Sequence, residues 1–482
     1  MELKKLLEKV DIVDCSADLS SSVSGVSYDT RSISRGDIFA AIKGFDGDGH
    51  AFIPDAIAKG AALIVCMETP KMKIPYIIVK DSRKALAAIS AAWFGYPAEK
   101  MKMIGVTGTN GKTTVTNLIK NVLETCTGEK IGLIGTNNNI IGTTEIETSL
   151  TTPESYELQK LFSQMVKQDC TYCVMEVSSH ALALHRVHGI TFDVGVFTNL
   201  TQDHLDFHGT MQNYAEAKAE LFKISKNAVI NIDDEYSQIM KNAATGRIFT
   251  YAVNDSSADL SAKELKLSAD KVEFLALAVG SLARAELYIP GLFSVYNALS
   301  VLAAASLLEI DIKQAAGALK TCGGVKGRAE VVPTNRDFSI LIDYAHTPDA
   351  LENILKAARS FAKGRVVALF GCGGDRDKTK RPLMAQVAAN FSDFVIITSD
   401  NPRTEQPSAI IEDILEGIKN KETPYMLIEN RREAIKWAIN NAKQGDVIIL
   451  AGKGHETYQI VGKEKIHFDE REVVAEILKE TP

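Results

Sequence analysis

Short apolar runs alternate with amphipathic stretches along most of the chain. Between residues 99 and 332 the apolar runs are MKMIGV, KIGLIG, YCVMEV, DVGVF and AVINI, and helical patterns separate them. This alternation is typical of a parallel sheet covered by helices. DKVEFLALAV and RAELYIP, later in the same region, have the pattern of antiparallel hairpins.

The same alternation returns at both ends of the chain. Residues 333–482 contain SILIDYA, RVVALFGCGG, FVIITSD, YMLI and DVIILAGKG, and residues 1–98 contain DIFAAI, ALIVC and YIIV before the turn-rich GYPAEK. A chain of 482 residues is too long for one ordinary core. We therefore predict an α/β protein of three domains, 1–98, 99–332 and 333–482.

The composition of the chain bears on its partners and its location. The chain is 45% hydrophobic and 24% charged, and its 54 Lys+Arg against 61 Asp+Glu give a net charge of -7. This acidic balance argues against a nucleic-acid partner, since such proteins carry a basic face. MELKKLLEKVDIVDC lacks the features of a signal peptide, and no apolar run has the length of a membrane span. We expect a cytoplasmic protein with no membrane partner.

The seven cysteines are scattered and do not suggest a disulfide framework. Cys170 and Cys173 form one CxxC, but further zinc ligands at a helpful spacing are missing nearby. We favour buried thiols over metal or redox chemistry.

The stretch GVTGTNGKTT follows a predicted strand and precedes a predicted helix. A Walker A loop has a glycine five residues before the glycine of its Gly-Lys pair, whereas Val106 stands there. The order of strand, glycine turn, Lys-Thr and helix nevertheless suits a nucleotide phosphate. Lys112 would reach the β- and γ-phosphates, and Thr113 would offer its hydroxyl to Mg²⁺. A plain tight turn leaves the lysine at the helix start unexplained. The candidate ATP-binding residues of this loop are Gly108, Thr109, Asn110, Gly111, Lys112, Thr113 and Thr114.

Other polar groups follow strands of the central region. Glu176 ends one strand, His204 and His208 follow the next, and Lys218 lies on a helix. Taken alone, Glu176 could equally be a solvated carboxylate and Lys218 an ordinary surface lysine. The histidines have the spacing of a zinc pair, but Asp206 is not adjacent to the first, as HExxH requires. In the third region DYAHTPD, GGDRDKTKRP, DNPR and GKGHE each follow a strand, so we expect them along one edge of the sheet.

TGTNGKTT is similar to the phosphate loop of the Mur ligase superfamily, and the resemblance covers essentially the whole chain. It implies an N-terminal domain that binds a UDP-linked substrate, a central P-loop ATPase domain with a mostly parallel sheet, and a Rossmann-like C-terminal domain that binds an amino acid. It also implies an ATP-dependent ligase that joins an amino acid to a nucleotide-linked peptide through an acyl phosphate.

The resemblance assigns roles around ATP. Glu176 and Thr113 would hold one Mg²⁺, and His204 would join Glu176 at a second. Lys218 would be carbamylated to N6-carboxylysine near the second ion and, with Lys112, Glu176 and His204, would be catalytic. Further ATP contacts would come from Asn297, Arg328, Asp343 and His346. The last two lie in the third domain, so we expect that domain to close over ATP.

The segment VSYDTRSISRGDIFAAIKG resembles the UDP-sugar segment of the tripeptide-forming ligases, with Asp29-Thr30-Arg31 in place of the usual D-S-R. This likeness implies UDP-N-acetylmuramoyl-L-alanyl-D-glutamate (UDP-MurNAc-L-Ala-D-Glu) as the acyl substrate. Its implied ligands are Ser27, which corresponds to a uridine contact, Asp29, Arg31, Thr151, Thr152, Ser178 and Arg186.

The DNPR motif, Asp400 to Arg403, bears on the incoming amino acid. Diaminopimelate carries a distal carboxylate that suits the planar fork of Arg403, and a distal ammonium that Asp400 could bind. The corresponding segment of lysine-adding relatives lacks that arginine. A helix-initiating turn would explain Asn401 and Pro402 but not the arginine. We therefore expect meso-diaminopimelate, with the ligands Arg376, Asp400, Asn401, Arg403, Gly452 and Glu456.

Four readings compete with this one. They are a lysine-adding ligase of the same family, a folylpolyglutamate synthetase, a P-loop NTPase acting as a switch or motor, and a scaffold without activity. The uridine-like N-terminal segment argues against the folate branch, and a scaffold leaves the motifs of the third region without a role. We expect a monomer whose partners are small molecules.

Overall fold

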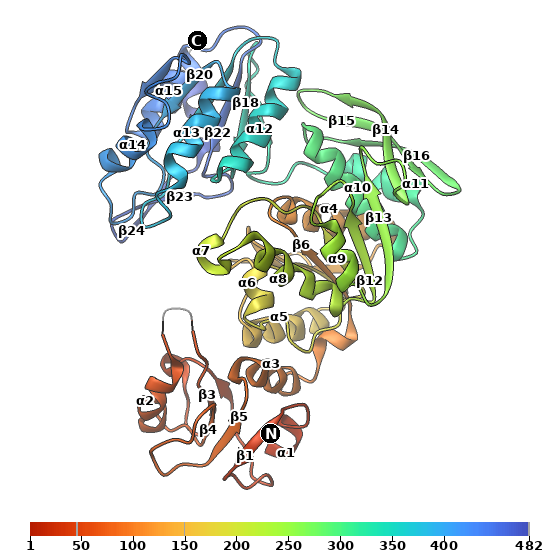
Figure 1. Cartoon of the computed structure of the whole chain (residues 1–482), viewed down its shortest axis with the longest axis vertical. Coiled ribbons are helices and arrows are strands. Elements are labelled where there is room, and N and C mark those ends of the chain that lie inside the picture. The colour runs from red at the N-terminus through yellow and green to blue at the C-terminus, as the bar shows by residue number, and fades with distance from the viewer. Residues whose placement is uncertain (45–46, 149, 481–482) are drawn as a thin grey trace.

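The computed structural model describes residues 1–44, 47–148 and 150–480. Three large sheets follow one another along the chain (Figure 1), with the N-terminal sheet at one end of an elongated molecule and the C-terminal sheet at the other. The predicted α/β class and three-part architecture are confirmed, because each sheet is mostly parallel and is covered by helices. None of the helices in the described ranges is long and apolar enough to cross a bilayer.

The N-terminal sheet has the order β1-β5-β4-β3-β2, and only β1 is antiparallel to its neighbour. Helix α3 begins where the Asp81 carboxylate accepts hydrogen bonds from the backbone N–H groups of Arg83 and Lys84. In Figure 1 this helix lies beside α5 of the central part. The elements are β1 Ile12–Cys15, β2 Val26–Ser27, β3 Ile38–Ala40, β4 Leu63–Cys66, β5 Tyr76–Val79, α1 Leu3–Leu6, α2 Ile53–Ala58 and α3 Ser82–Trp93.

The central sheet has the order β16-β15-β14-β13-β12-β11-β6-β10-β7-β8-β9. In this order, neighbouring strands from β14 through to β7 are parallel to one another, whereas the strands at both edges of the sheet pair antiparallel. The predicted hairpin character of β15 and β16 is therefore confirmed. The strands are β6 Lys102–Thr107, β7 Lys130–Ile134, β8 Asn139–Ile141, β9 Thr144–Ile146, β10 Cys170–Glu176, β11 Val194–Phe197, β12 Asn227–Asn231, β13 Arg247–Ala252, β14 Leu260–Leu267, β15 Val272–Ala278 and β16 Ser281–Leu287.

Helices cover both faces of the central sheet. Ile104 and Val106 of β6 pack in a core with α4 and α10, whereas the intervening side chains of the strand face a core with α5 and α8. β6 lies between β10 and β11, so the three strand ends that carry the predicted ATP residues are neighbours. The helices are α4 Lys112–Thr127, α5 Ser155–Lys167, α6 Ser179–Ala183, α7 Leu205–His208, α8 Met211–Lys223, α9 Ser237–Ala243, α10 Leu292–Leu307 and α11 Ile312–Thr321.

The C-terminal sheet has the order β17-β18-β22-β19-β20-β21, with only β17 antiparallel. The four predicted motifs follow β18, β19, β20 and β22, so they meet at one edge, as expected. The elements are β17 Glu330–Val332, β18 Ser339–Asp343, β19 Val366–Phe370, β20 Phe394–Ile397, β21 Tyr425–Leu427, β22 Val447–Ala451, the hairpin β23 Tyr458–Val461 and β24 Glu464–His467, α12 Pro348–Phe361, α13 Lys380–Phe391, α14 Pro407–Leu415, α15 Arg431–Asn440 and α16 Glu470–Glu480.

A short linker joins the central and C-terminal parts. The third sheet already begins with β17 at Glu330, three residues before the predicted boundary at 333, and the domain limits stay a proposal. The Arg471 guanidinium bonds both Glu330 and the Gly454 carbonyl, the latter at 2.9 Å. The start of the third sheet is thereby tied to the loop that carries GKGHE.

Candidate active site

The phosphate loop runs from the end of β6 to the start of α4 and depends on two glycines. Gly108 and Gly111 have φ angles of +151° and +86°, which other residues rarely adopt. A Cβ on Gly108 would lie 1.8 Å from Thr198 Oγ1, and one on Gly111 would lie 2.7 Å from Asn297 Oδ1. Asn297, predicted as an ATP contact, is therefore packed directly on this loop.

Two amines converge on the loop. Lys112 Nζ donates to the carbonyls of Gly108 and Thr109 at 2.9 and 2.8 Å, and Lys218 Nζ donates to the same Gly108 carbonyl at 2.8 Å. Lys218 is buried, and burial together with the positive charge of Lys112 holds its pKa well below the ordinary value. The pKa of Lys112 is also lowered by burial. An anion beside this loop would therefore meet two nitrogen donors.

Glu176 is buried at the end of β10 and is the centre of a hydrogen-bond network. Its carboxylate accepts from Thr113 Oγ1 at 3.1 Å, from the Thr136 N–H at 2.7 Å and from Thr136 Oγ1 at 3.1 Å. Arg328 Nη2 donates to Thr113 Oγ1 at 3.1 Å. Thr113 and Glu176 supply hard oxygen donors side by side, which is the donor type that Mg²⁺ prefers.

The predicted dipeptide ligands lie next to this network. Thr151 Oγ1 is 3.0 Å from Thr136 Oγ1, and Thr152 Oγ1 donates to the Glu176 carbonyl at 2.8 Å. The Ser178 N–H donates to Thr152 Oγ1 at 3.1 Å. Two side chains, Glu176 and Thr136, thus connect Thr113 of the phosphate loop to Thr151.

Arg186 is held between the central and N-terminal domains. Its Nη1 donates to the Thr152 carbonyl at 3.0 Å, and its Nε lies 3.4 Å from Glu154 Oε1. Arg83 of α3 forms an ion pair with the other oxygen of Glu154 at 2.9 Å. The Glu154 carboxylate therefore fixes a guanidinium from each domain.

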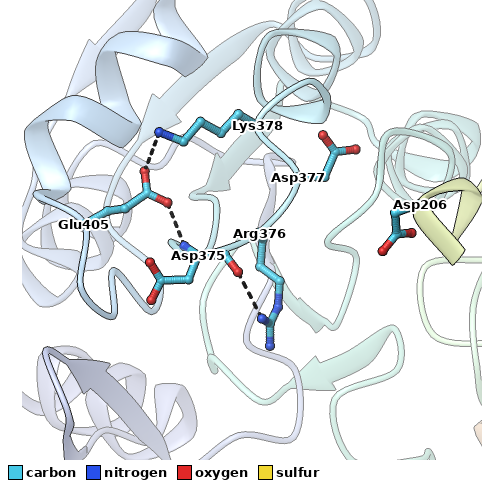
Figure 2. A pocket seen from close by; sticks show the side chains of 6 residues that line it. All are labelled: Asp206, Asp375, Arg376, Asp377, Lys378 and Glu405. Carbon is cyan, nitrogen blue, oxygen red and sulfur yellow. Dashed lines mark hydrogen bonds and ion pairs between the residues drawn. The ribbon is translucent and has the colours of Figure 1, made fainter. Parts of the chain in front are cut away.

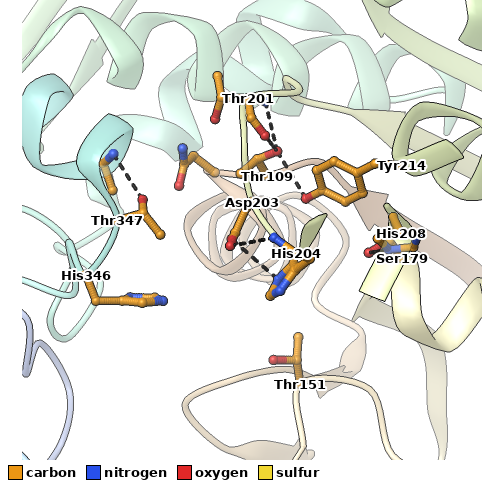
Figure 3. A network of polar contacts seen from close by, with 12 residues as sticks. Thr109, Thr151, Ser179, Thr201, Asp203, His204, His208, Tyr214, His346 and Thr347 are labelled. Carbon is orange, nitrogen blue, oxygen red and sulfur yellow. Dashed lines mark hydrogen bonds and ion pairs between the residues drawn. The ribbon is translucent and has the colours of Figure 1, made fainter. Parts of the chain in front are cut away.

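His204 lies beside the phosphate loop with Asp203, Thr109, Thr201 and Tyr214 (Figure 3). His204 Nε2 is 3.4 Å from Asp203 Oδ2, and the ring stacks edge-on against His180 at 4.8 Å between centroids. Burial, with the neighbouring His204 and His208, lowers the pKa of His180 to about 4, so this ring is neutral. In the described ranges, groups of three or more His, Cys, Asp or Glu side chains arranged to hold a metal ion are absent.

Asp343, one of the two predicted ATP residues of the third domain, contacts the linker. Asp343 Oδ2 accepts from the Ala329 N–H at 2.6 Å, and burial raises the pKa of Asp343 while Arg328 opposes the rise. The Arg328 guanidinium lies 4.8 Å above the Tyr344 ring. His346 Nδ1 is 2.7 Å from the Tyr344 carbonyl.

Ser27, Asp29 and Arg31, which are predicted to bind the UDP-linked substrate, form a small turn that is distant in sequence from the other predicted ligands. Ser27 is buried, and its Oγ donates to the Asp29 carbonyl at 2.9 Å and lies 2.8 Å from Ser32 Oγ. The Asp29 carboxylate caps this turn and forms an ion pair with the exposed Arg31 at 2.6 Å. Tyr28 extends from the same turn to the central domain, where it donates to Glu157 Oε2 at 2.9 Å.

Four of the six amino-acid candidates, Asp400, Asn401, Gly452 and Glu456, lie together in a mostly buried polar cluster, whereas Arg376 is exposed. Asn401 Nδ2 donates to Glu456 Oε2 at 2.9 Å, and Lys453 Nζ donates to Glu456 Oε2 at 2.9 Å and to Asn401 Oδ1 at 3.2 Å. Asp400 is buried, and its Oδ1 lacks a hydrogen-bond partner. A Cβ on Gly452 would lie 2.8 Å from Asp400 Oδ2, so glycine leaves room for this carboxylate.

Arg403 has a φ of +51°, an uncommon conformation for a non-glycine residue. Its backbone is fixed by the hairpin, because its N–H donates to the Ile460 carbonyl at 3.1 Å. Its Nη1 donates to the Gly374 carbonyl at 2.7 Å, and a Cβ on Gly373 would lie 2.8 Å from Nη1. A strained backbone held on both sides is typical of functional positions.

A cavity of about 560 Å³ opens between α7 and the third domain (Figure 2). Arg376, one of the predicted ligands, is on its wall, and its Nη1 donates to the Asp375 carbonyl at 3.0 Å. Across the cavity stands Asp206 of α7. The lining residues are Asp206, Asp375, Arg376, Asp377, Lys378 and Glu405.

Sequence reasoning missed four residues that connect the predicted ones. They are Thr136, Glu154, Lys453 and Asp349, the last of which accepts hydrogen bonds from Asn110 and Thr201. Glu154 follows Thr151-Thr152-Pro153 directly, and Lys453 lies inside the GKGHE motif. Lys453 and Asp349 stood within motifs already singled out, since Asp349 ends DYAHTPD, and Glu154 directly follows two predicted ligands, whereas Thr136 carried no signal of its own.

Comparisons with known proteins identify the family of the chain. The pattern of the Mur ligase family catalytic domain matches residues 22–94, that of the Mur ligase middle domain matches residues 106–305, and that of the Mur ligase glutamate ligase domain matches residues 327–454. The chain is 50% identical to UDP-N-acetylmuramoyl-L-alanyl-D-glutamate–2,6-diaminopimelate ligase 1 of Clostridium acetobutylicum, over 100% of both chains. It is 51% identical to the corresponding ligase of Caldanaerobacter subterraneus, over 95% of both.

A solved structure of a UDP-N-acetylmuramoyl-L-alanyl-D-glutamate–2,6-diaminopimelate ligase superposes with a TM-score of 0.73 at 32% identity. The match covers 100% of this chain and 99% of that one. The resemblance of the phosphate loop, the order of the three sheets and these full-length matches lead to one conclusion. The chain belongs to the Mur ligase family.

Proposed function

We propose that this enzyme is an ATP-dependent ligase that adds meso-diaminopimelate to UDP-N-acetylmuramoyl-L-alanyl-D-glutamate, in the synthesis of peptidoglycan precursors. The observation that carries the proposal is the hydrogen-bond path from Thr113 through Glu176 and Thr136 to Thr151. It joins a nucleotide phosphate loop to the predicted position of the dipeptide. ATP and the acyl substrate would thus bind on either side of one buried carboxylate.

In this proposal the first step transfers the γ-phosphoryl group of ATP to the terminal carboxylate of the dipeptide. A carboxylate oxygen bonds to the γ-phosphorus, and ADP leaves. The amine of the incoming amino acid then attacks the acyl carbon and loses a proton, and phosphate leaves with the former carboxylate oxygen. Bringing two anions together is the main electrostatic cost, and Lys112, the backbone N–H groups of the loop and Arg328 would offset it.

Magnesium fits the donor set on the central sheet. Thr113, Glu176 and His204 would hold it, and Mg²⁺ commonly uses one or two protein carboxylates together with substrate phosphates. When bound, the ion would neutralise charge on the phosphate oxygens. Lys218 suits carbamylation because it is buried beside the loop, and the lowered pKa favours the neutral, nucleophilic form of its amine.

The amino-acid pocket supports diaminopimelate over lysine. Asp400 Oδ1 is a buried acceptor without a hydrogen bond, so an ammonium group of the incoming amino acid would satisfy it. Arg403 would pair with the distal carboxylate that lysine lacks. Lysine would leave that guanidinium without a carboxylate, and because Arg403 is half-buried we place the cost at roughly 2 kcal/mol, the lower end of the range for buried pairs. Since about 1.4 kcal/mol is tenfold, the pocket would discriminate on the order of 30-fold.

One experiment separates this proposal from its rivals. The protein is incubated with ATP, Mg²⁺ and UDP-MurNAc-L-Ala-D-Glu, and diaminopimelate or lysine is then added. We expect phosphate release and a product heavier by one diaminopimelate residue. A lysine adduct would instead support the lysine-adding ligase, and phosphate release independent of any amino acid would support a P-loop NTPase of another kind.

We also propose that the enzyme acts as a monomer in the cytoplasm. Its proposed substrates are small charged molecules. Light scattering after size exclusion should give the mass of one chain, and a dimer mass at working concentrations would overturn the monomer.

A further inference from the structure

Lys453 lies at the centre of the amino-acid pocket, although it is not among the ligands that the family motifs suggest. It follows β22 between Gly452 and Gly454, whose φ angles are +112° and +52°. A Cβ on Gly454 would lie 2.6 Å from Tyr344 Cβ, so the loop packs tightly against the end of β18. The lysine is fully buried, with 0% of its side chain exposed.

Three pocket residues meet its ammonium group. Lys453 Nζ is 2.9 Å from Glu456 Oε2, 3.2 Å from Asn401 Oδ1 and 3.6 Å from Asp400 Oδ1. Asn401 Oδ1 also accepts from the Ile460 N–H at 2.9 Å, while its Nδ2 donates to Glu456. The amide is therefore held in one orientation by the lysine on one side and the β23 backbone on the other.

The contacts of Lys453 with Asp400 and Glu456 join groups of opposite charge. Asp400 and Glu456 are two carboxylates of this cluster, and the ammonium group of Lys453 forms an ion pair with each, at 3.6 and 2.9 Å. Lys453 compensates both. Its distance to Asp400 Oδ1 is longer than a hydrogen bond, so that oxygen has no hydrogen-bonded partner.

We propose that Lys453 is a positioning residue that holds Asn401 and Glu456 in place and leaves Asp400 Oδ1 available to the incoming amino acid. The inference rests on the proposed function, since it deepens the amino-acid site of that reaction. Lys453 itself acts through its neighbours and would not touch ATP or the UDP-linked substrate.

The test compares Lys453→Met and Lys453→Gln with wild type in steady-state phosphate release. We expect the KM for meso-diaminopimelate to rise at least tenfold in both variants. The KM values for ATP and for UDP-MurNAc-L-Ala-D-Glu should stay within about twofold. Lys453→Gln keeps a hydrogen-bond donor in the cluster and decides the question if Lys453→Met does not fold. Arg365→Met is the matched control, because it removes an ion pair with buried Asp446 at the opposite end of the same sheet and should change none of the three KM values.

Two groups of results would overturn the inference. A KM for diaminopimelate within twofold of wild type in a folded variant excludes the positioning role. Equal rises in all three KM values, or loss of folding in both variants, assign Lys453 a purely structural role. If wild type itself releases no phosphate in response to diaminopimelate, the proposed function fails instead, and the two failures are distinct.

Discussion

The Asp349 carboxylate of α12 accepts a hydrogen bond from Asn110 Nδ2 of the phosphate loop at 2.6 Å. The same oxygen accepts from Thr201 Oγ1, after β11, at 2.9 Å. A single side chain of the third domain thus contacts two loops of the central ATPase sheet. Burial raises the pKa of Asp349, and the hydrogen bonds from Thr201 and Asn110 oppose the rise. This contact holds the third domain against the site where ATP would bind.

Asp349→Ala should loosen the third domain. A hydrogen bond to a charged group contributes about 1.5–3 kcal/mol, and partial exposure of Asp349 places the expected loss near the lower end. We expect proteolytic cleavage in the linker, residues 322–329, to become about tenfold faster. Asn353→Ala is the control, because Asn353 bonds the same carboxylate from within α12. Equal cleavage rates for Asp349→Ala and wild type would show that the contact does not hold the domain.

Glu154→Gln should weaken binding of the UDP-linked substrate. The change removes the charge that fixes both Arg186 and Arg83, and these three side chains are only 11–14% exposed. We expect the KM for UDP-MurNAc-L-Ala-D-Glu to rise about 5- to 30-fold, equivalent to roughly 1–2 kcal/mol. The KM for ATP should be unchanged.

Glu99→Gln serves as the comparison for Glu154→Gln. Glu99 also forms an ion pair with a residue of the N-terminal domain, Lys9, but both of these side chains are more than half exposed. Exposed pairs contribute little, so this variant should behave as wild type. A Glu154→Gln enzyme with an unchanged KM would mean that Arg186 does not need its carboxylate partner.

Lys218→Ala should abolish most activity, by at least a hundredfold, because the amine lies on the phosphate loop and is the predicted carbamate. Mass spectrometry of the native enzyme should show one added CO₂ on the peptide that contains Lys218. Activity should fall in CO₂-depleted buffer and return with bicarbonate. Lys223→Ala, on the exposed end of the same helix, should retain full activity. An unmodified Lys218 in a fully active enzyme would contradict the carbamate.

Much of this fold could be predicted from the sequence, because local patterns of apolar and polar residues determine its helices and strands. The β6 strand, the glycine turn and α4 are contiguous, and their order alone predicts a phosphate loop. The motifs after β18, β19, β20 and β22 each end a strand of a parallel sheet, so their common edge follows from topology. The need for glycine at 108 could be suspected, but its cause, Thr198 Oγ1, appears only in the fold.

The connecting residues could not be predicted, since their partners are distant in the chain. Asn110 and Asp349 are 239 residues apart, and periodicity cannot show that such residues meet. Lys453 lies between two glycines and looks like a spacer in a turn, until its burial among Asn401, Glu456 and Asp400 is known. Arg403 was expected in the pocket, but not its left-handed backbone.

Arg403→Ala should raise the KM for diaminopimelate strongly, on the order of 30-fold or more. The reason is that the distal carboxylate would lose its partner, whereas lysine has no such group. The ratio of kcat/KM for diaminopimelate to that for lysine should therefore fall by a similar factor. Arg432→Ala, an exposed arginine of the same domain, is the control. An unchanged KM would remove Arg403 from the amino-acid pocket.

The central claim is that the triphosphate beside Gly111 and Lys112 activates a peptide carboxyl group. The most direct measurement starts from UDP-MurNAc-L-Ala-D-Glu labelled with ¹⁸O at both oxygens of its reacting carboxylate, incubated with ATP, Mg²⁺ and diaminopimelate. Mass analysis of the released phosphate should find one labelled oxygen in each molecule, because the carboxylate oxygen stays with phosphorus when the amine displaces it. Unlabelled phosphate would mean that water attacks ATP directly, and would contradict the account.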